Sequence, residues 1–200
     1  EGTIYMLFAD KTQDFLIDKV KEELAITTIG VDYGAGKSKI KFVASGITYN
    51  FRKVYVLDEM DLSGIYDPEQ IYEKFIEFYK RVYGKYNKCQ YAFCDYGALG
   101  NVITLGLIRR CQREGLPVQI ADCSKGLIND RIFLSSTLMA QKRFYILRKN
   151  KIITKAFQDA LWNDKKLDER LDDGTTDIDS LDAFEYSINS FYENLINSRR

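Results

Sequence analysis

Apolar residues along the chain follow two spacings, one typical of β-strands and one typical of α-helices. Residues 24–32 form a nearly continuous apolar run, which predicts a buried strand. Residues 39–48 place apolar or small side chains at every second position, which predicts a second strand. A hairpin turn at Tyr49 and Asn50 leads into a third predicted strand over residues 53–59. The sheet is therefore expected to begin with three antiparallel strands.

Helices and strands alternate in the rest of the chain. Asp67 and Pro68 supply an N-cap and a first-turn proline for a helix whose apolar residues recur every three or four positions as far as Gly84. The same spacings predict strands at 89–94, 118–121 and 143–147, and helices at 98–114, 125–140, 151–162 and 177–197. We therefore expect an α/β domain whose mixed β-sheet is antiparallel in the first three strands, then parallel, and flanked by helices.

Length and patterning predict one folded domain. The chain has 200 residues, enough for a single α/β domain with a substantial core. Residues 24–200 carry the predicted domain, whereas residues 1–23 are weakly patterned and are expected to form a strand or linker that leads in from an upstream domain. The first residue is Glu1 rather than Met, so we expect an excised piece of a longer protein. Residues 163–176 are polar and acidic, which predicts an exposed loop or small hairpin.

The composition excludes several classes of chemistry. The chain has no histidine, which rules out Ser-His-Asp and Cys-His catalysis and leaves acid–base work to carboxylates, lysines, tyrosines or metal-bound water. Its four cysteines lack C-x-x-C spacing, which favours buried free thiols in a reducing compartment over a structural zinc site. No apolar stretch reaches the roughly 18 residues that a membrane span needs, so no membrane partner is expected.

Charge is unevenly distributed, although the formal net charge is zero. Residues 121–155 carry eight Lys and Arg against two Asp, and residues 156–200 carry five Lys and Arg against eleven acids. A basic stretch beside an acidic one suits a protein that binds phosphates with one surface and metal with another. The alternative is that both stretches are solvated faces. The basic residues expected to contact phosphate are Lys125, Arg131, Lys149 and Lys151.

Three aspartates occupy positions from which metal ligands can converge. Asp32 ends the first predicted strand, Asp95 ends the strand predicted at 89–94, and Asp182 lies on the last helix, one turn after Asp179. Like charges that close repel each other unless a cation neutralises them, and hard divalent cations prefer oxygen ligands. The pattern therefore predicts a divalent-metal site of the kind that two-metal phosphodiesterases use.

Most of these acids also have an ordinary structural explanation. Asp32 suits an Asx-type turn, and Asp95 suits the N-cap of the helix that follows it. Asp179 lies in the first turn of its helix, where the helix dipole favours an acid. Asp182 has no such explanation, because it lies close to the apolar stripe of the helix and a carboxylate there requires a partner. Glu185, three residues further on, is either a helper or simply exposed.

Five segments, in this order and spacing, resemble those of a known family. They are Gly30-Val31-Asp32, Val54-Tyr55-Val56-Leu57-Asp58-Glu59, Cys94-Asp95, Lys125-Gly126 to Arg131-Ile132, and Asp179-Ser180-Leu181-Asp182-Ala183-Phe184-Glu185-Tyr186. The family is the nuclease domain of tailed-bacteriophage terminase large subunits, and the resemblance covers about residues 24–190. It implies a ribonuclease H-like fold and a metal-dependent endonuclease that cuts concatemeric viral DNA during genome packaging.

The resemblance also implies roles for the aspartates. Two Mg²⁺ or Mn²⁺ ions, about 3.5–4 Å apart, would activate the attacking water and stabilise the leaving 3′ oxygen. Asp32 would bind both ions, Asp95 one of them and Asp182 the other. Many relatives carry His-x-x-Asp on the last helix, and Asp179 occupies the His position here, where it would assist as a fourth ligand. The basic residues Lys125, Arg131, Lys149 and Lys151 would then contact DNA.

Partners and rivals follow from the same resemblance. The implied partners are double-stranded DNA, an upstream ATPase domain of the same polypeptide, the portal and the small terminase subunit. The DNA would be cut with little sequence specificity, in the host bacterial cytoplasm.

A Holliday-junction resolvase or transposase of the same fold would share the metal ligands. An actin-like or sugar-kinase-like ATPase is a further rival, because Gly30-Val31-Asp32-Tyr33-Gly34 also resembles its first phosphate loop, but such proteins pair two lobes, for which this chain is too short. A non-catalytic DNA-binding or motor-docking module would carry a degenerate site, which metal titration would distinguish.

Overall fold

A mixed β-sheet forms the centre of the computed structural model, which describes residues 2–34, 39–64, 67–97 and 99–198. Within these ranges the sheet has seven strands in the order β1-β7-β4-β3-β2-β5-β6. The strands are β1 (Leu16–Ile17), β2 (Leu24–Asp32), β3 (Lys41–Thr48), β4 (Val54–Asp61), β5 (Tyr91–Cys94), β6 (Gln119–Asp122) and β7 (Phe144–Leu147). β2, β3 and β4 pair antiparallel and the remaining neighbours pair parallel, which confirms the predicted mixed sheet.

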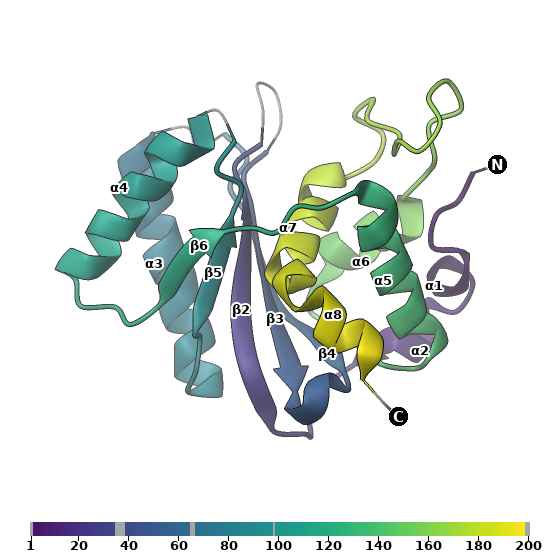
Figure 1. The fold of residues 1–200 in the computed structure, drawn as a ribbon, viewed down its shortest axis with the longest axis horizontal. Coiled ribbons are helices and arrows are strands. Elements are labelled where there is room, and N and C mark those ends of the chain that lie inside the picture. The colour runs from purple at the N-terminus through teal and green to yellow at the C-terminus, as the bar shows by residue number, and fades with distance from the viewer. Residues whose placement is uncertain (1, 35–38, 65–66, 98, 199–200) are drawn as a thin grey trace.

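Helices cover both faces of this sheet, so the molecule has three layers (Figure 1). One face carries α3 (Pro68–Tyr86) and α4 (Leu99–Arg113). The other face carries α1 (Met6–Asp10), α2 (Thr12–Phe15), α5 (Ile128–Ala140), α6 (Lys151–Asp159), α7 (Ile178–Ile188) and α8 (Tyr192–Asn197). Among the described helices, none is both long and apolar enough to cross a membrane.

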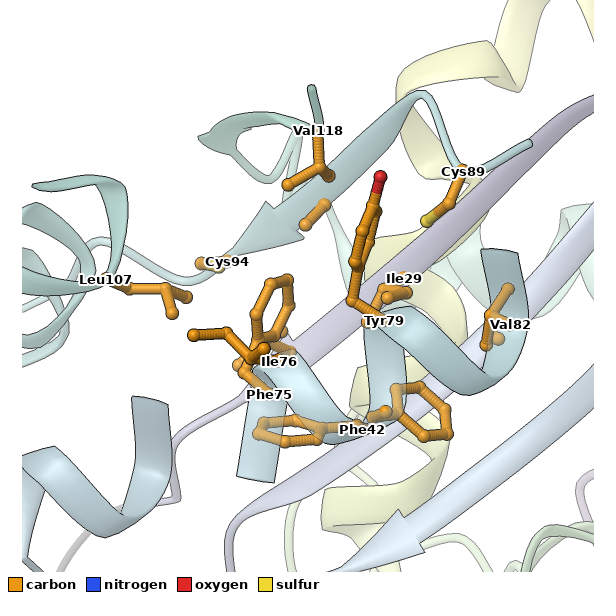
Figure 2. Packing of buried hydrophobic residues seen from close by; sticks show 14 of the residues in the cluster. Ile29, Phe42, Phe75, Ile76, Tyr79, Val82, Cys89, Cys94, Leu107 and Val118 are labelled. Atoms are coloured by element: carbon orange, nitrogen blue, oxygen red, sulfur yellow. The ribbon is translucent and has the colours of Figure 1, made fainter. Parts of the chain in front are cut away.

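The face covered by α3 and α4 holds the larger hydrophobic cluster. α3 buries Phe75 and Val82, which project onto Ile29 of β2 and Phe42 of β3 (Figure 2). The rings of Phe42 and Phe75 meet edge to face with their centroids 5.8 Å apart. The three-and-four spacing of apolar residues read from the sequence is therefore the spacing of the buried stripe of α3.

α3 begins where the sequence predicts and ends later. The Asp67 carboxylate accepts a hydrogen bond from the backbone N–H of Glu69 at 2.8 Å, and Pro68 occupies the first helical position. The predicted stop at Gly84 is wrong, because the helix continues to Tyr86. Asn87 ends it in the left-handed conformation, with φ of 57°, which asparagine tolerates better than most residues.

The N-terminal residues contain more structure than the predicted strand or linker. Among residues 2–23, residues 6–10 and 12–15 form the short helices α1 and α2, and residues 16–17 form a strand, β1, which pairs with β7. Phe8 and Phe15 are buried in the second hydrophobic cluster, beneath α6 and β7. These two aromatic anchors are seven residues apart, too sparse to produce a clear local period.

Two further expectations require correction or fall outside the structure. The single helix predicted at 177–197 is interrupted, because residues 189–191 form a 3-10 turn between α7 and α8. At that break the Asn189 side-chain amide donates a hydrogen bond to the backbone carbonyl of Ser124, which draws the chain away from a straight helix. Of the turn residues expected after Asp32, Ala35 and Gly36 lie outside the described residues, whereas the backbone N–H of Gly34 donates to the Asp32 carboxylate at 3.1 Å, as expected for an Asx-type turn.

α7 lies directly against β2, and one glycine permits that approach. A Cβ atom at Gly30 would lie 1.7 Å from the carbonyl oxygen of Ala183, so any larger residue would displace the helix. The Thr28 hydroxyl donates a hydrogen bond of 2.7 Å to the carbonyl oxygen of Ser187. This contact fixes the height of α7 along β2 and brings its acidic N-terminal half to the end of the strand that carries Asp32.

Candidate metal centre

Two of the predicted ligands leave the same edge of the sheet. β2 and β5 are parallel neighbours, and Val31 pairs with Cys94 in their register. Asp32 and Asp95, the residues that come directly after this pair, therefore lie at the ends of two adjacent strands. Because parallel strands present their C-terminal ends together, the two apolar runs that are closed by Asp end at the same edge of the sheet.

α7 brings Asp182 and Asp179 to the same edge. Its N-terminus is capped by Asp177, whose carboxylate accepts a hydrogen bond from the backbone N–H of Ser180 at 3.0 Å. The buried Lys41 ammonium lies 3.5 Å from the Asp177 carboxylate and 3.0 Å from that of Asp61. Lys41, at the start of β3, therefore links Asp61 at the end of β4 to Asp177 at the start of α7 through two ion pairs. Nothing in the local sequence marks Lys41 as buried, so it is not among the predicted site residues.

The Asp32 carboxylate is crowded by other acids and lacks a cationic partner among the described residues. Its exposed fraction is 8%, and the backbone N–H of Gly34 donates to it at 3.1 Å. Burial raises the pKa of Asp32 well above its usual value, and the negative charges of Asp182, Asp179 and Asp95 raise it further against that hydrogen bond. A buried carboxylate in such surroundings is a favourable place for a divalent cation, so the residues present fit a metal.

Asp95, unlike Asp32, already has a cationic partner. The Lys125 ammonium lies 2.8 Å from one carboxylate oxygen, and the backbone N–H of Gly97 donates to the other at 2.9 Å. Burial raises the pKa of Asp95, but these two contacts outweigh it and hold the pKa below its usual value. Lys125 is 53% exposed, so the structure places this predicted phosphate contact beside the cluster and open to solvent.

Asp182 is bound by two arginines. Arg131 donates to its Oδ1 at 2.9 Å, and Arg170 donates to the same oxygen. Arg131 was expected to contact DNA, but its side chain is only 2% exposed and is engaged by Asp182 and Glu185. The structure therefore does not present Arg131 to an incoming phosphate. Glu185 is likewise buried rather than exposed. Arg170 is not among the predicted site residues, because it lies in a polar segment without periodicity.

Asp179 lies at the margin of the cluster. The backbone N–H of Lys39 donates to its carboxylate at 2.9 Å. Burial raises the pKa of Asp179, and the charges of Asp177 and Asp182 add to the rise against that hydrogen bond. Asp179 also lines an open cavity of about 800 Å³, between α6 and the segment before α7, together with the lysines Lys39, Lys151 and Lys155.

The two remaining predicted DNA contacts lie near the start of α6. Lys151 is exposed at the first residue of the helix and lines the same cavity as Asp179. Lys149 is 51% exposed, and its ammonium lies 3.4 Å from the buried Asp58 carboxylate. Both ammonium groups reach solvent, although that of Lys149 is partly neutralised.

A more compact ligand group includes two residues, Asp122 and Cys123, that are not among the predicted ligands. Among the described residues, Asp95, Asp122 and Cys123 form the one group of three acidic or thiol side chains whose ligand atoms all lie within 4.8 Å of one another. Asp32, Asp95 and Asp182 thus form a wider cluster. Asp122 pairs with Cys94 in the register of β6 with β5, so the same strand-end rule, applied to the next strand, would have found it.

Solved structures of large terminases share this architecture. A large terminase from a thermophilic bacteriophage matches with a TM-score of 0.72 and 16% identity, over 98% of this chain and 46% of that chain. The P22 large terminase nuclease domain matches with a TM-score of 0.68 and 11% identity, over 97% of each chain. The fold is that of a large-terminase nuclease domain. The large terminase nuclease of thermophilic phage G20c with bound magnesium also matches, with a TM-score of 0.61 and 12% identity over 94% of this chain and 97% of that chain.

This likeness to large-terminase nuclease domains is one of fold. No family model and no curated protein matches the chain by sequence. The chain spans less than half of the first of these large terminases, at 46%, and nearly all of the P22 nuclease domain, at 97%. The mixed sheet with helices on both faces and the match to these nuclease domains confirm the ribonuclease H-like fold that the sequence predicted.

Proposed function

We propose that this chain is a metal-dependent endodeoxyribonuclease domain that cleaves concatemeric viral DNA during genome packaging, with little sequence specificity. The observation that carries the proposal is the buried Asp32 carboxylate, which faces the charges of Asp182, Asp179 and Asp95 and has no ion-pair partner among the described residues. Such a cluster costs stability unless a cation occupies it. The fold adds support, since one nuclease that shares it was solved with bound magnesium.

The carboxylates suggest how Mg²⁺ or Mn²⁺ would be held. Asp32 would contact two ions, with Asp95 on one side, Asp182 on the other and Asp179 assisting. When bound, such ions activate water as a nucleophile and stabilise the leaving oxygen of a phosphodiester. Lys125 orients Asp95 through its 2.8 Å contact, and because its ammonium is half exposed it is also available to a DNA phosphate.

The rest of the packaging role concerns a longer protein. Because the large terminase that matches over 46% of its own length is about twice as long as this chain, we propose an ATPase domain upstream in the same polypeptide. Contacts with the portal and the small terminase subunit, and a place in the host bacterial cytoplasm, belong to the same proposal. A resolvase, a transposase or a non-catalytic docking module is less well supported, because the match to the P22 nuclease domain extends over 97% of both chains.

Cleavage of supercoiled plasmid in Mn²⁺ tests the proposal, and the Asp179→Ala variant tests the fourth ligand. EDTA should abolish cleavage by the unmodified chain and excess Mn²⁺ should restore it. Asp179→Ala should retain partial activity but require about tenfold more Mn²⁺, because one carboxylate at the margin of the site is lost. Cleavage that persists in EDTA would contradict the metal-dependent mechanism. An unchanged Mn²⁺ requirement would show that Asp179 is not a metal ligand and acts only through its hydrogen bond with the Lys39 backbone N–H.

Charge reversal of Lys149 and Lys151 should weaken binding of double-stranded DNA. Each lysine that contacts a DNA phosphate releases cations bound to the DNA. Loss of both lysines should therefore make the slope of the logarithm of the binding constant against the logarithm of the salt concentration shallower by roughly one to two. The matched control is charge reversal of Lys80 and Lys85 on α3, which covers the opposite face of the sheet (Figure 1). Fluorescence anisotropy across a salt series measures both pairs. Equal effects from the two pairs would indicate that the DNA does not follow the α6 side of the molecule.

A further inference from the structure

Four charged side chains form a buried network beside the predicted metal ligands. Arg131 donates to Glu185 Oε2 at 2.7 Å and to Asp182 Oδ1 at 2.9 Å. Arg170 donates to Glu185 Oε1 at 2.7 Å and also to Asp182 Oδ1. Each guanidinium therefore bridges the two carboxylates, and Glu185 engages one arginine with each of its oxygens. The network joins α5, the segment before α7, and α7 itself.

Asp182 is the member of this network that faces outward. Its side chain is 19% exposed, whereas those of Arg131, Arg170 and Glu185 are at most 3% exposed. Both arginines use the same oxygen, Oδ1, and no described donor hydrogen-bonds to Oδ2. A carboxylate held through one oxygen has a fixed orientation and keeps the other available.

Stability alone is a poor explanation for these buried charges. Ion pairs of this kind are often no more stabilising than well-packed apolar residues of the same size, because both charges must be desolvated. The Nε atoms of Arg131 and Arg170 are buried and lack a hydrogen-bond partner among the described residues. The network therefore retains two unsatisfied donors while it fully engages one oxygen of Asp182.

We infer that Arg131 and Arg170 are positioning residues that hold Asp182, braced by Glu185, so that Asp182 Oδ2 is directed to a divalent cation. The inference rests on the proposed function, because it assigns Asp182 to the metal. It replaces the expectation that Arg131 contacts DNA. Arg170 is itself held in place by a backbone bridge to Trp162, so the segment between α6 and α7 takes part in forming the site.

Titration of the 200-residue chain with Mn²⁺ alone, by calorimetry, tests this role with the R170Q variant. Loss of a positioning group should weaken Mn²⁺ binding by about 10–100-fold. Simple electrostatics predicts the opposite sign, because removal of a nearby positive charge would make the site more attractive to a cation. Tighter binding in R170Q would therefore overturn the inference, and unchanged binding would reduce Arg170 to a purely structural residue.

Matched variants separate positioning from general destabilisation. R143Q removes another buried arginine, one that donates to the backbone carbonyls of Phe51 and Leu195 at 2.8 and 2.7 Å, far along the sheet from the aspartates. It should lower the melting temperature but leave the Mn²⁺ affinity within about twofold, whereas R170Q should change both. If R170Q does not fold, R170K keeps the charge but not the two-pronged geometry, and it should still weaken Mn²⁺ binding.

D182N distinguishes failure of the inference from failure of the proposed function. If the unmodified chain binds no Mn²⁺, or if D182N binds it as tightly as the unmodified chain, the assignment of Asp182 to the metal is wrong and the arginine role fails with it. If D182N weakens binding while R170Q and R170K leave it unchanged, the metal site stands and only the arginine role is rejected.

Discussion

Asp32→Asn should abolish Mn²⁺-dependent cleavage of plasmid DNA while leaving the melting temperature of the metal-free protein unchanged or higher. Asparagine keeps the shape of the side chain but removes the charge that two cations would share. Loss of a group that lowers the activation free energy by several kcal/mol, through stabilisation of charge in the transition state, corresponds to a rate decrease of roughly a thousandfold or more. The stability should not fall, because the substitution removes a buried negative charge among three others.

The pH dependence of that stability follows from the raised pKa of Asp32. Burial first, and then the charges of Asp182, Asp179 and Asp95, make the ionised carboxylate less favourable in the folded protein than in the unfolded chain. At a pH below the usual carboxyl pKa of about 4, Asp32 is protonated in both states and asparagine confers no advantage. As the pH rises from about 4 to the raised pKa, the unmodified chain loses stability that Asp32→Asn keeps, and above the raised pKa this difference stays constant. Calorimetric melting temperatures in EDTA should therefore diverge in favour of Asp32→Asn as the pH increases.

Asp58→Asn is the matched control for this experiment. Asp58 is also a buried aspartate, but Arg81 lies 2.7 Å from its carboxylate and Lys149 lies 3.4 Å away. Loss of this paired charge should lower the melting temperature and leave Mn²⁺-dependent cleavage in place. Full cleavage by Asp32→Asn, or loss of cleavage in both variants, would contradict the assignment of Asp32 to the metal site.

Gly30→Ala should produce the largest loss of stability of any conservative change considered for this chain. The added methyl group would lie 1.7 Å from the Ala183 carbonyl oxygen and 2.7 Å from the Ser187 backbone nitrogen. Neither atom can move without displacement of α7, so the free energy of unfolding should fall by roughly 3 kcal/mol. Because α7 carries Asp182 and β2 carries Asp32, the displacement should also weaken Mn²⁺ binding. Urea denaturation and calorimetric titration measure the two effects.

Gly84→Ala provides the control for Gly30→Ala. Gly84 lies within α3, and a Cβ atom there would meet nothing within 4 Å. Alanine has a higher helix propensity than glycine, so this variant should gain about 0.5–1 kcal/mol of stability and bind Mn²⁺ as before. If Gly30→Ala were tolerated as well as Gly84→Ala, the close packing of α7 on β2 would not be what positions Asp182.

The sequence alone indicated which carboxylates lie at the ends of strands. Asp32 and Asp95 each close an apolar run, and β2 and β5 are parallel neighbours, so both carboxylates reach one edge of the sheet. Asp122 follows the same rule on β6, and it went unnoticed because its strand is short and only half-buried. The helix end predicted at Gly84 is wrong, because glycine ends many helices but α3 continues past Gly84 and ends at Asn87.

The sequence by itself determined the strands and helices between residues 24 and 188 and the aspartates at the strand ends, because burial imposes periods of two and of about 3.6 on neighbouring residues. The tertiary structure alone decided which charges meet. Arg131 and Asp182 are 51 residues apart and Lys125 and Asp95 are 30 apart, and no local period relates them. The contact of Arg131 with Asp182 requires α7 to pack against β2, which Gly30 permits, and the contact of Lys125 with Asp95 joins the segment before α5 to the end of β5. Long-range packing therefore turned Arg131 from an expected DNA contact into a buried partner of Asp182.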